Sequence, residues 1–154
     1  MSQSIIEMNS SYVVKRYNDK PHNKLSSVDS ELYMLNRFDS IHAPKILRRI
    51  KNGYVMERYD YPLGTTKRLE RECPNMLDNL NSIQADLVRC GILHWDINPG
   101  NLLYSKRNGC LKLIDFYWAT PVGGKRPDIP KLNQYYGIDE DAFDKLRSEC
   151  GQGN

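Results

Sequence analysis

Glycine is missing from the start of this sequence, where the first of ten glycines is Gly53. A glycine-rich turn that cradles phosphate therefore cannot lie in that part of the chain, because such turns need glycine for close backbone approach. No C-x-x-C pair occurs among the four cysteines, and only three histidines could complete a zinc site. We therefore predict four free thiols, at Cys73, Cys90, Cys110 and Cys150.

Long apolar runs are also absent. No stretch approaches the ~20 apolar residues of a membrane span, and the first residues, MSQSIIEMNSS, lack the basic start and long apolar core of a secretory signal. We therefore expect no transmembrane segment. We also expect the protein to be located in a reducing cytoplasm, or to be secreted into the cytoplasm of a host cell. Basic and acidic residues number 22 and 19 and are mixed along the chain, so the net charge of +3 does not indicate nucleic-acid binding.

What the sequence does contain is the composition of a globular domain. Its 154 residues, 40% of them apolar and 27% charged, suffice for one hydrophobic core. The β-rich runs at 4–8 and 12–18 predict a hairpin, and the runs at 44–50 and 53–62 predict another around an Asn-Gly turn. Between these hairpins, apolar residues at helical spacing predict a helix over 27–38.

The second part of the chain is predicted to contain more helix. Apolar residues recur at intervals of three and four through 74–91, which predicts the longest helix of the chain. Short strands are predicted at 101–105 and 111–116, joined by a second Asn-Gly turn. The Gly- and Pro-rich stretch 120–134 is expected to form an exposed loop, and 139–147 to form a short helix.

A tight group of polar residues follows the long helix in the stretch HWDINPGNLLY. Asp96 stands two residues after His94, Asn101 five residues after Asp96, and Asp115 near the end of the next predicted hairpin. Taken singly, such residues often cap their own backbone or form turns. Their joint spacing favours a shared chemical role.

This order of helix, polar loop and hairpin resembles that of the protein-kinase-like superfamily. HWDINPGN matches H-x-D-x-x-P-x-N, and IDFYWA stands where D-F-G is expected. YVVKRY, with Lys15, resembles the V-A-I-K strand, and Glu31 has the position of the helix Glu that pairs with this Lys. The likeness covers about 5–120.

The resemblance implies an α+β fold in which the whole chain forms a single minimal kinase-like domain. A small β-rich N-lobe would occupy about 1–60, a hinge about 57–64, and a truncated helical C-lobe about 65–154. Within the hinge, the segment from Glu57 to Tyr59 would meet adenine.

The resemblance also implies the chemistry of ATP and Mg²⁺, because phosphoryl transfer requires neutralised phosphate charge and an oriented hydroxyl. Asp96 would accept or orient the hydroxyl proton. Asn101 and Asp115 would hold Mg²⁺ against the phosphates, and Lys15, paired with Glu31, would hold the α- and β-phosphates. His94 is expected to orient the loop backbone.

Several positions depart from the family pattern. No glycine-rich loop precedes Lys15, Asn98 replaces the Lys that Ser/Thr kinases commonly place two residues after the catalytic Asp, and Tyr117 replaces the Gly of D-F-G. No A-P-E follows Asp115, and the 39 residues after it are too few for the usual helical platform for a peptide substrate.

Three functions remain open from the sequence. The first is a partner-assisted protein Ser/Thr kinase, similar to the small effector kinases that bacteria inject into host cells. The second is a small-molecule or glycan kinase, because H-x-D-x-x-x-x-N without the Lys is also similar to aminoglycoside, choline and lipopolysaccharide-core kinases. The third is a pseudokinase that acts as a binding module. A protein partner or self-association is expected, with Lys125 and Arg126 as a contact for an acidic surface.

Overall fold

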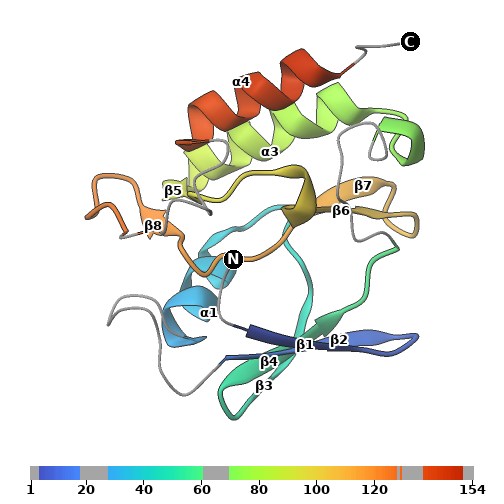
Figure 1. Cartoon of the computed structure of the whole chain (residues 1–154), viewed down its shortest axis with the longest axis vertical. Coiled ribbons are helices and arrows are strands. Elements are labelled where there is room, and N and C mark those ends of the chain that lie inside the picture. The colour runs from blue at the N-terminus through green and yellow to red at the C-terminus, as the bar shows by residue number, and fades with distance from the viewer. Residues whose placement is uncertain (1–3, 18–27, 61–69, 128, 130–136, 151–154) are drawn as a thin grey trace.

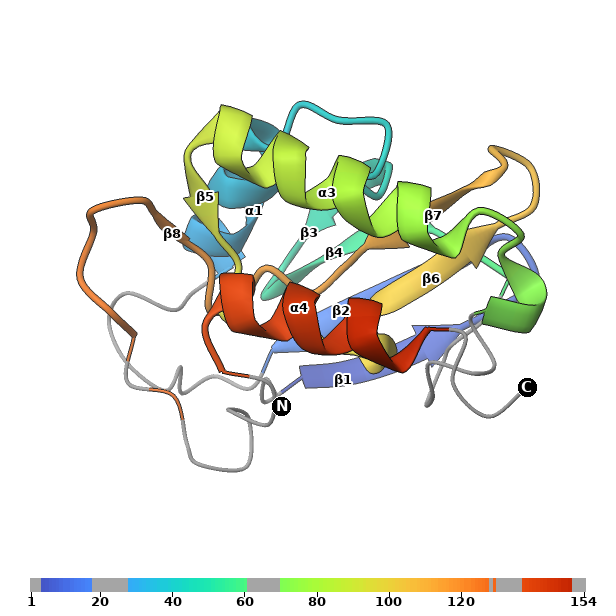
Figure 2. The same cartoon turned by 90° about the horizontal axis from the view of Figure 1, so that it is seen from above.

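The computed structural model describes residues 4–17, 28–60, 70–127, 129 and 137–150. The fold is α+β, with a sheet and one helix at one end of the molecule and two helices side by side at the other (Figures 1 and 2). The described strands are β1 (Ser4–Met8), β2 (Tyr12–Tyr17), β3 (Ile46–Ile50), β4 (Gly53–Glu57), β5 (Ile92–Leu93), β6 (Leu102–Ser105), β7 (Cys110–Leu113) and β8 (Thr120–Pro121). The helices are α1 (Val28–Arg37), α3 (Met76–Cys90), α4 (Asp139–Glu149) and the 3₁₀ turn η1 (Pro99–Asn101).

The four-stranded sheet has the order β1-β2-β4-β3, with antiparallel neighbours. Both predicted hairpins are confirmed, although β4 ends at Glu57, earlier than the sequence pattern suggested. Gly53 begins β4, where an added Cβ would lie 1.9 Å from the carbonyl oxygen of Lys15. Glycine is therefore required for β4 to approach β2 beside Lys15.

Helix α1 confirms the helix predicted over 27–38, of which residue 27 lies outside the described residues. Its inward stripe buries Met34 and Leu35, as a 3.6-residue period requires. Glu31 lies on the same buried side and is 0% exposed. A carboxylate in that position needs compensating partners.

Helices α3 and α4 confirm the two predicted helices and pack side by side (Figure 2). The β6–β7 hairpin is confirmed as well, but β7 ends at Leu113 and does not extend to 116 as predicted. The Ile114 N–H still donates to the Asn101 carbonyl at 2.9 Å, which continues the β6–β7 register by one residue. The extended backbone then stops because Asp115 adopts a left-handed φ of 60°.

The loop predicted over 120–134 is only partly confirmed. Residues 121–126 are exposed, as expected, whereas Ile129 is buried in a second hydrophobic cluster, and 128 and 130–134 lie outside the described residues. Thr120–Pro121 forms β8, which pairs with β5 and was not predicted. A strand of two residues is too short to show the alternation by which strands are recognised.

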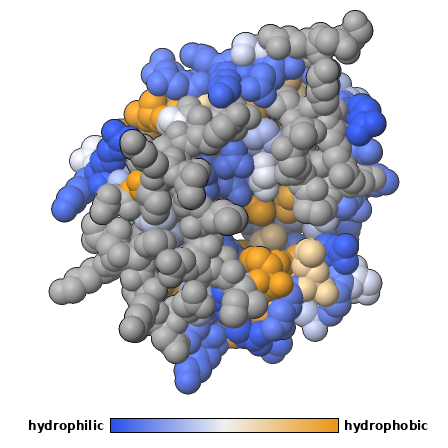
Figure 3. All heavy atoms as spheres, in the orientation of Figure 1, coloured by the Kyte–Doolittle hydropathy of each residue, from blue (hydrophilic) through white to orange (hydrophobic). Residues whose placement is uncertain are grey.

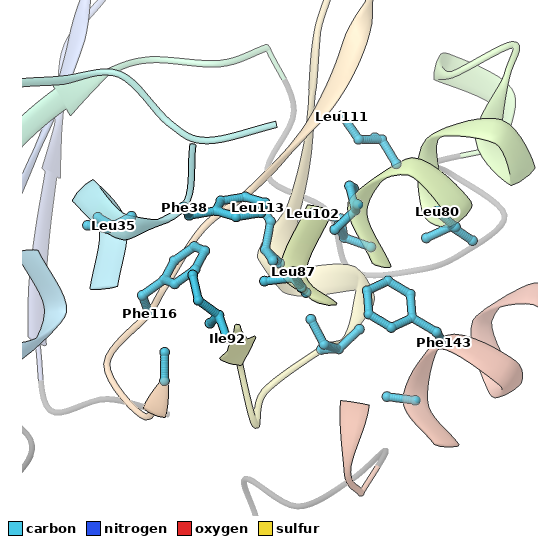
Figure 4. Packing of buried hydrophobic residues seen from close by; sticks show 14 of the residues in the cluster. Leu35, Phe38, Leu80, Leu87, Ile92, Leu102, Leu111, Leu113, Phe116 and Phe143 are labelled. Atoms are coloured by element: carbon cyan, nitrogen blue, oxygen red, sulfur yellow. The ribbon is translucent and has the colours of Figure 1, made fainter. Parts of the chain in front are cut away.

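One hydrophobic core joins the sheet end to the helical end. Figure 4 shows Leu35 of α1 and Phe38 beside Phe116, with apolar side chains continuing toward Phe143 of α4. The rings of Phe38 and Phe116 have centroids 5.4 Å apart. Phe116, one residue after Asp115, thereby packs this part of the chain against Phe38 and, with ring centroids 4.8 Å apart, against His94.

None of the described helices is long and apolar enough to cross a membrane. The four cysteines have free thiols, as predicted. The division into N-lobe, hinge and C-lobe stays a prediction, and hinge residues 61–64 lie outside the described residues.

Candidate active site

Lys15 lies at the centre of a buried charge cluster. It stands in β2 on the same face as Val13, because alternate residues of a strand share a face, and it is 5% exposed. Its Nζ lies 3.3 Å from Glu31 Oε2 and 3.2 Å from Asp115 Oδ1. Three segments that are distant in the sequence therefore meet at one ammonium group.

Glu31 is tied to more than Lys15. The Tyr54 hydroxyl donates to its Oε2 at 3.1 Å, and the Phe116 backbone N–H donates to the same oxygen at 2.8 Å. These bonds replace the water that a buried carboxylate loses. Glu31 thus couples helix α1 to β4 and to the segment that carries Asp115.

The electrostatics of the cluster keep Lys15 charged. Burial alone lowers the pKa of Lys15, but the carboxylates of Asp115 and Glu31 outweigh burial, so this pKa is raised above its usual value. Burial would raise the pKa of Asp115, yet the Lys15 ammonium reverses the effect and holds it below its usual range. The site therefore presents a fixed cation and an ionised carboxylate side by side.

Asp96 lies in the loop between β5 and η1, with its carboxylate oriented by two side-chain amides. Asn98 Nδ2 donates to Oδ1 at 3.0 Å, and Asn101 Nδ2 donates to Oδ2 at 3.0 Å. Both amides also donate to the Asp96 carbonyl. Burial raises the pKa of Asp96, and the nearby Asp115 carboxylate adds to the rise. An oriented carboxylate with a raised pKa is suited to accept a proton.

His94 has the orienting geometry that the sequence suggested. Its Nε2–H donates to the Ile114 carbonyl at 2.9 Å, while its Nδ1 accepts from the Asp96 backbone N–H at 3.1 Å. With one nitrogen donating and the other accepting, the ring is a neutral imidazole. His94 therefore joins the loop of Asp96 to the strand end that carries Asp115.

Asp139 is a positioning residue that the sequence analysis missed. Its Oδ2 accepts from the His94 N–H at 2.7 Å, and its Oδ1 accepts from the Trp95 N–H at 2.8 Å. It is 6% exposed at the start of α4. In the sequence it is one of several acidic residues at a helix start, where acidic residues are common because of the helix dipole, so no local signal distinguishes it.

The donor set around Asn101 and Asp115 fits Mg²⁺ bound through phosphates. Because Asn101 Nδ2 donates to Asp96, its amide oxygen is directed elsewhere and can serve as a metal ligand. No group of three or more His, Cys, Asp or Glu side chains that could hold a metal exists within the described parts of the chain. An Asn and an Asp would suffice for Mg²⁺ only together with substrate phosphates and water.

The predicted adenine contacts, Glu57 and Tyr59, lie at and just after the end of β4. The Glu57 carboxylate lies 3.5 Å from Arg107 Nη1, and Tyr59 is 5% exposed, with its hydroxyl accepting from the Lys45 N–H at 2.7 Å. The Tyr59 ring is thus a packing group. An adenine base bound at this segment would therefore have to contact the main chain of the segment and not these two side chains.

No protein-family model matches the chain. Among curated proteins, it is 39% identical over 82 residues to the serine/threonine-protein kinase DCLK1 of Rattus norvegicus, which covers 51% of this chain and 18% of that protein. It is 27% identical over 96 residues to the probable serine/threonine-protein kinase fnkB of Dictyostelium discoideum, covering 60% of this chain and 17% of that protein. A mitogen-activated protein kinase kinase kinase 7-like protein of Drosophila melanogaster is 21% identical over 143 residues, 80% of this chain and 35% of that protein.

These partial similarities support a protein-kinase-like relationship. The chain spans between 17% and 35% of the length of these curated relatives. At the level of reaction class they support a phosphotransferase. They do not report on particular residues, so the roles of the site residues rest on the geometry described above.

Proposed function

We propose that this chain is an ATP- and Mg²⁺-dependent phosphotransferase that phosphorylates a hydroxyl group. The observation that carries this proposal is the position of Lys15, held between Glu31 and Asp115 in a buried site. A fixed cation beside an ionised carboxylate is the arrangement needed to hold phosphate oxygens and their metal ion. Asp96, in the adjoining loop, is the only further carboxylate that this mechanism requires.

An apolar surface beside Lys15 supports nucleotide binding. In the β1–β2 pairing, Ile6 is opposite Lys15 and Met8 is opposite Val13, and directly opposed residues share one face of a sheet. Ile6 and Met8 are 50% and 57% exposed. Figure 3 shows apolar surface in the middle of this side of the molecule, over β1. A flat base could cover this surface while its phosphates reach Lys15.

The proposed mechanism assigns one task to each group. Lys15 would bind phosphate oxygens, and Glu31 would keep its ammonium in place. Mg²⁺, held by Asn101 and Asp115, would neutralise charge on the phosphates. Asp96 would accept a hydrogen bond from the attacking hydroxyl and take its proton as the new P–O bond forms. The bond between the γ-phosphorus and the β–γ bridging oxygen would break at the same time, and ADP would leave with that oxygen.

Binding of ATP is expected to depend on Mg²⁺. Without the cation, the phosphates would face the Asp115 carboxylate directly, and this repulsion should weaken ATP binding at least about tenfold. Calorimetric titration of ATP with magnesium and with chelator measures the difference. An Asn101→Ala variant should lose most of the magnesium effect. Equal ATP affinity in both buffers would contradict the metal assignment.

The rate of transfer is expected to fall at mildly acidic pH. Asp96 must be ionised to accept a proton, and its pKa is raised, so activity should be lost on acidification at a pH above the ordinary Asp value of about 3.9. A kcat profile against pH, with circular dichroism at each point as a control for folding, tests this expectation. A rate that stays constant down to about pH 4 would contradict the assignment of Asp96 as the base.

For the acceptor, we propose a protein Ser/Thr hydroxyl and assistance by a protein partner. A small-molecule or glycan acceptor is the second candidate, because Asn98 places an uncharged amide on Asp96 where protein kinases commonly carry Lys. Transfer from labelled ATP into protein, glycan and small-molecule fractions of a lysate, kept apart, distinguishes the two. Label confined to the protein fraction, and increased by a purified protein from it, supports the first candidate.

A further inference from the structure

A second, smaller hydrophobic cluster lies beside the site and has no role in the mechanism above. Its buried members are Trp95, Tyr117, Trp118 and Ile129, and Tyr17 and Leu93 pack against it. It contains residues from the loop of Asp96 and from the segment that follows Asp115. This segment, defined here as residues 117–127, carries β8 and the basic pair Lys125 and Arg126.

Trp95 makes specific contacts with this segment. Its Nε1–H donates to Thr120 Oγ1 at 2.8 Å, and the Arg126 guanidinium carbon lies 5.4 Å from the centroid of its ring. The first contact is directional and the second places a cation on an aromatic ring. A tryptophan that served only to fill space in the core would need neither the hydrogen bond to Thr120 nor the contact with Arg126.

The backbone of Trp95 adds an independent observation. Trp95 has a φ of 71°, which is rare for a bulky residue. Such strain persists only where surrounding contacts impose it, and it is concentrated at functional sites. Here the Asp139 carboxylate holds the Trp95 N–H, and the next residue in the chain is Asp96.

We propose that Trp95 is a positioning residue, which locks residues 117–127 onto the loop of Asp96 and so fixes the direction of the Asp96 carboxylate. This inference rests on the proposed phosphotransferase function. Because the backbone of Trp95 leads directly into Asp96, a shift of its ring displaces the carboxylate that receives the hydroxyl proton. The Lys15 ammonium is held by the Glu31 and Asp115 carboxylates, and the cluster reaches this pair through Tyr117, whose N–H donates to Asp115 Oδ1 at 3.4 Å. We therefore expect a change at the Trp95 ring to affect the direction of Asp96 more than the binding of Mg·ATP.

The kinetic test uses Trp95→Phe, which keeps an aromatic ring but removes the N–H, and Trp95→Ala, which removes both. We expect kcat to fall about fivefold in the first variant and about 100-fold in the second, because small misplacement of a catalytic group has effects of this size. The Kd for Mg·ATP should change less than about twofold. In a double-mutant cycle, Thr120→Val should add nothing to Trp95→Phe, because the two changes break the same hydrogen bond.

A matched control separates positioning from loss of stability. Phe143→Leu reduces a fully buried ring that belongs to the main hydrophobic core and not to the Trp95 cluster, and should lower the melting temperature without a selective fall in kcat. Because Trp95→Ala removes a large buried side chain and can unfold the chain, Trp95→Phe remains the deciding variant. Wild-type kcat in Trp95→Phe, or an equal loss of kcat in Phe143→Leu, would overturn the proposal.

Limited trypsin digestion tests the same lock without any activity assay. Cleavage after Lys125 should be at least about tenfold faster in Trp95→Ala than in wild type, because local opening controls proteolysis, and it should be unchanged in Phe143→Leu under native conditions. Unchanged cleavage in a folded Trp95→Ala protein would overturn the lock. If the wild-type chain transfers no phosphate to any acceptor, the proposed function fails, and the digestion alone decides whether Trp95 holds the segment.

Discussion

Asp96→Asn is expected to lower the rate of phosphoryl transfer about 1,000-fold while leaving the Kd for Mg·ATP within about twofold of the wild-type value. The amide keeps the size of the carboxylate but cannot take the hydroxyl proton. Nucleotide affinity should persist because, in the proposed mechanism, Asp96 acts on the acceptor, whereas Lys15 would hold the phosphates and Asp115 would hold their magnesium ion. Steady-state transfer from labelled ATP, together with calorimetry, measures both quantities.

A matched control for this change is Asp141→Asn. Asp141 is an exposed carboxylate on α4, so the same chemical substitution there should leave both rate and affinity unchanged. Circular dichroism should give the same helix content for both variants. Transfer at the wild-type rate by Asp96→Asn would show that another group accepts the proton, and the mechanism would then be wrong.

Lys15→Met is expected to produce the second large effect, on nucleotide binding and on stability together. Removing the ammonium leaves the buried Glu31 and Asp115 carboxylates without their shared cation. Breaking a buried ion pair from one side costs about 3–5 kcal/mol of folding free energy. Mg·ATP affinity should fall about 100-fold, because Lys15 is the proposed phosphate ligand.

The sign of the pH dependence distinguishes this explanation from a general loss of packing. In wild type, Lys15 opposes the rise that burial causes in the pKa of Glu31. Without Lys15 that pKa should rise further, so protonation would relieve the buried charge and the stability deficit of Lys15→Met should shrink as the pH falls below neutral. Urea unfolding at two pH values measures this, with Lys125→Met on the exposed loop as the control. A variant as stable as wild type at neutral pH would contradict the buried-pair interpretation.

The elements that carry the site were predictable because their patterns are local. The β-rich run around Lys15 and the helical spacing around Glu31 each identify one element without knowledge of the rest of the chain. The contact between Lys15, Glu31 and Asp115 depends on the tertiary structure. The sequence indicated it only through the resemblance of motifs, and the structure shows the three side chains within hydrogen-bond distance.

The parts that were not predictable depend on contacts between distant residues. Asp139 has no local feature that separates it from its acidic neighbours, although it holds two backbone N–H groups of the loop before Asp96. The hydroxyl of Tyr54 reaches Glu31 only because β4 lies beside β2. Trp95 filled an unspecified position in the H-x-D motif. Its contacts with Thr120, Arg126 and Asp139, together with its backbone angle, are what support the proposed role.

The most direct test of the central claim is a time course of γ-phosphate transfer from labelled ATP by the purified wild-type chain, with an acceptor fraction, in magnesium and in chelator. The buried Lys15, Glu31 and Asp115 cluster and the oriented Asp96 predict label on a hydroxyl of the acceptor in magnesium only. They also predict its loss in both Asp96→Asn and Lys15→Met. A folded chain that binds Mg·ATP but labels no acceptor, or label that is transferred equally well by Asp96→Asn, would contradict the claim that this site is a phosphotransferase.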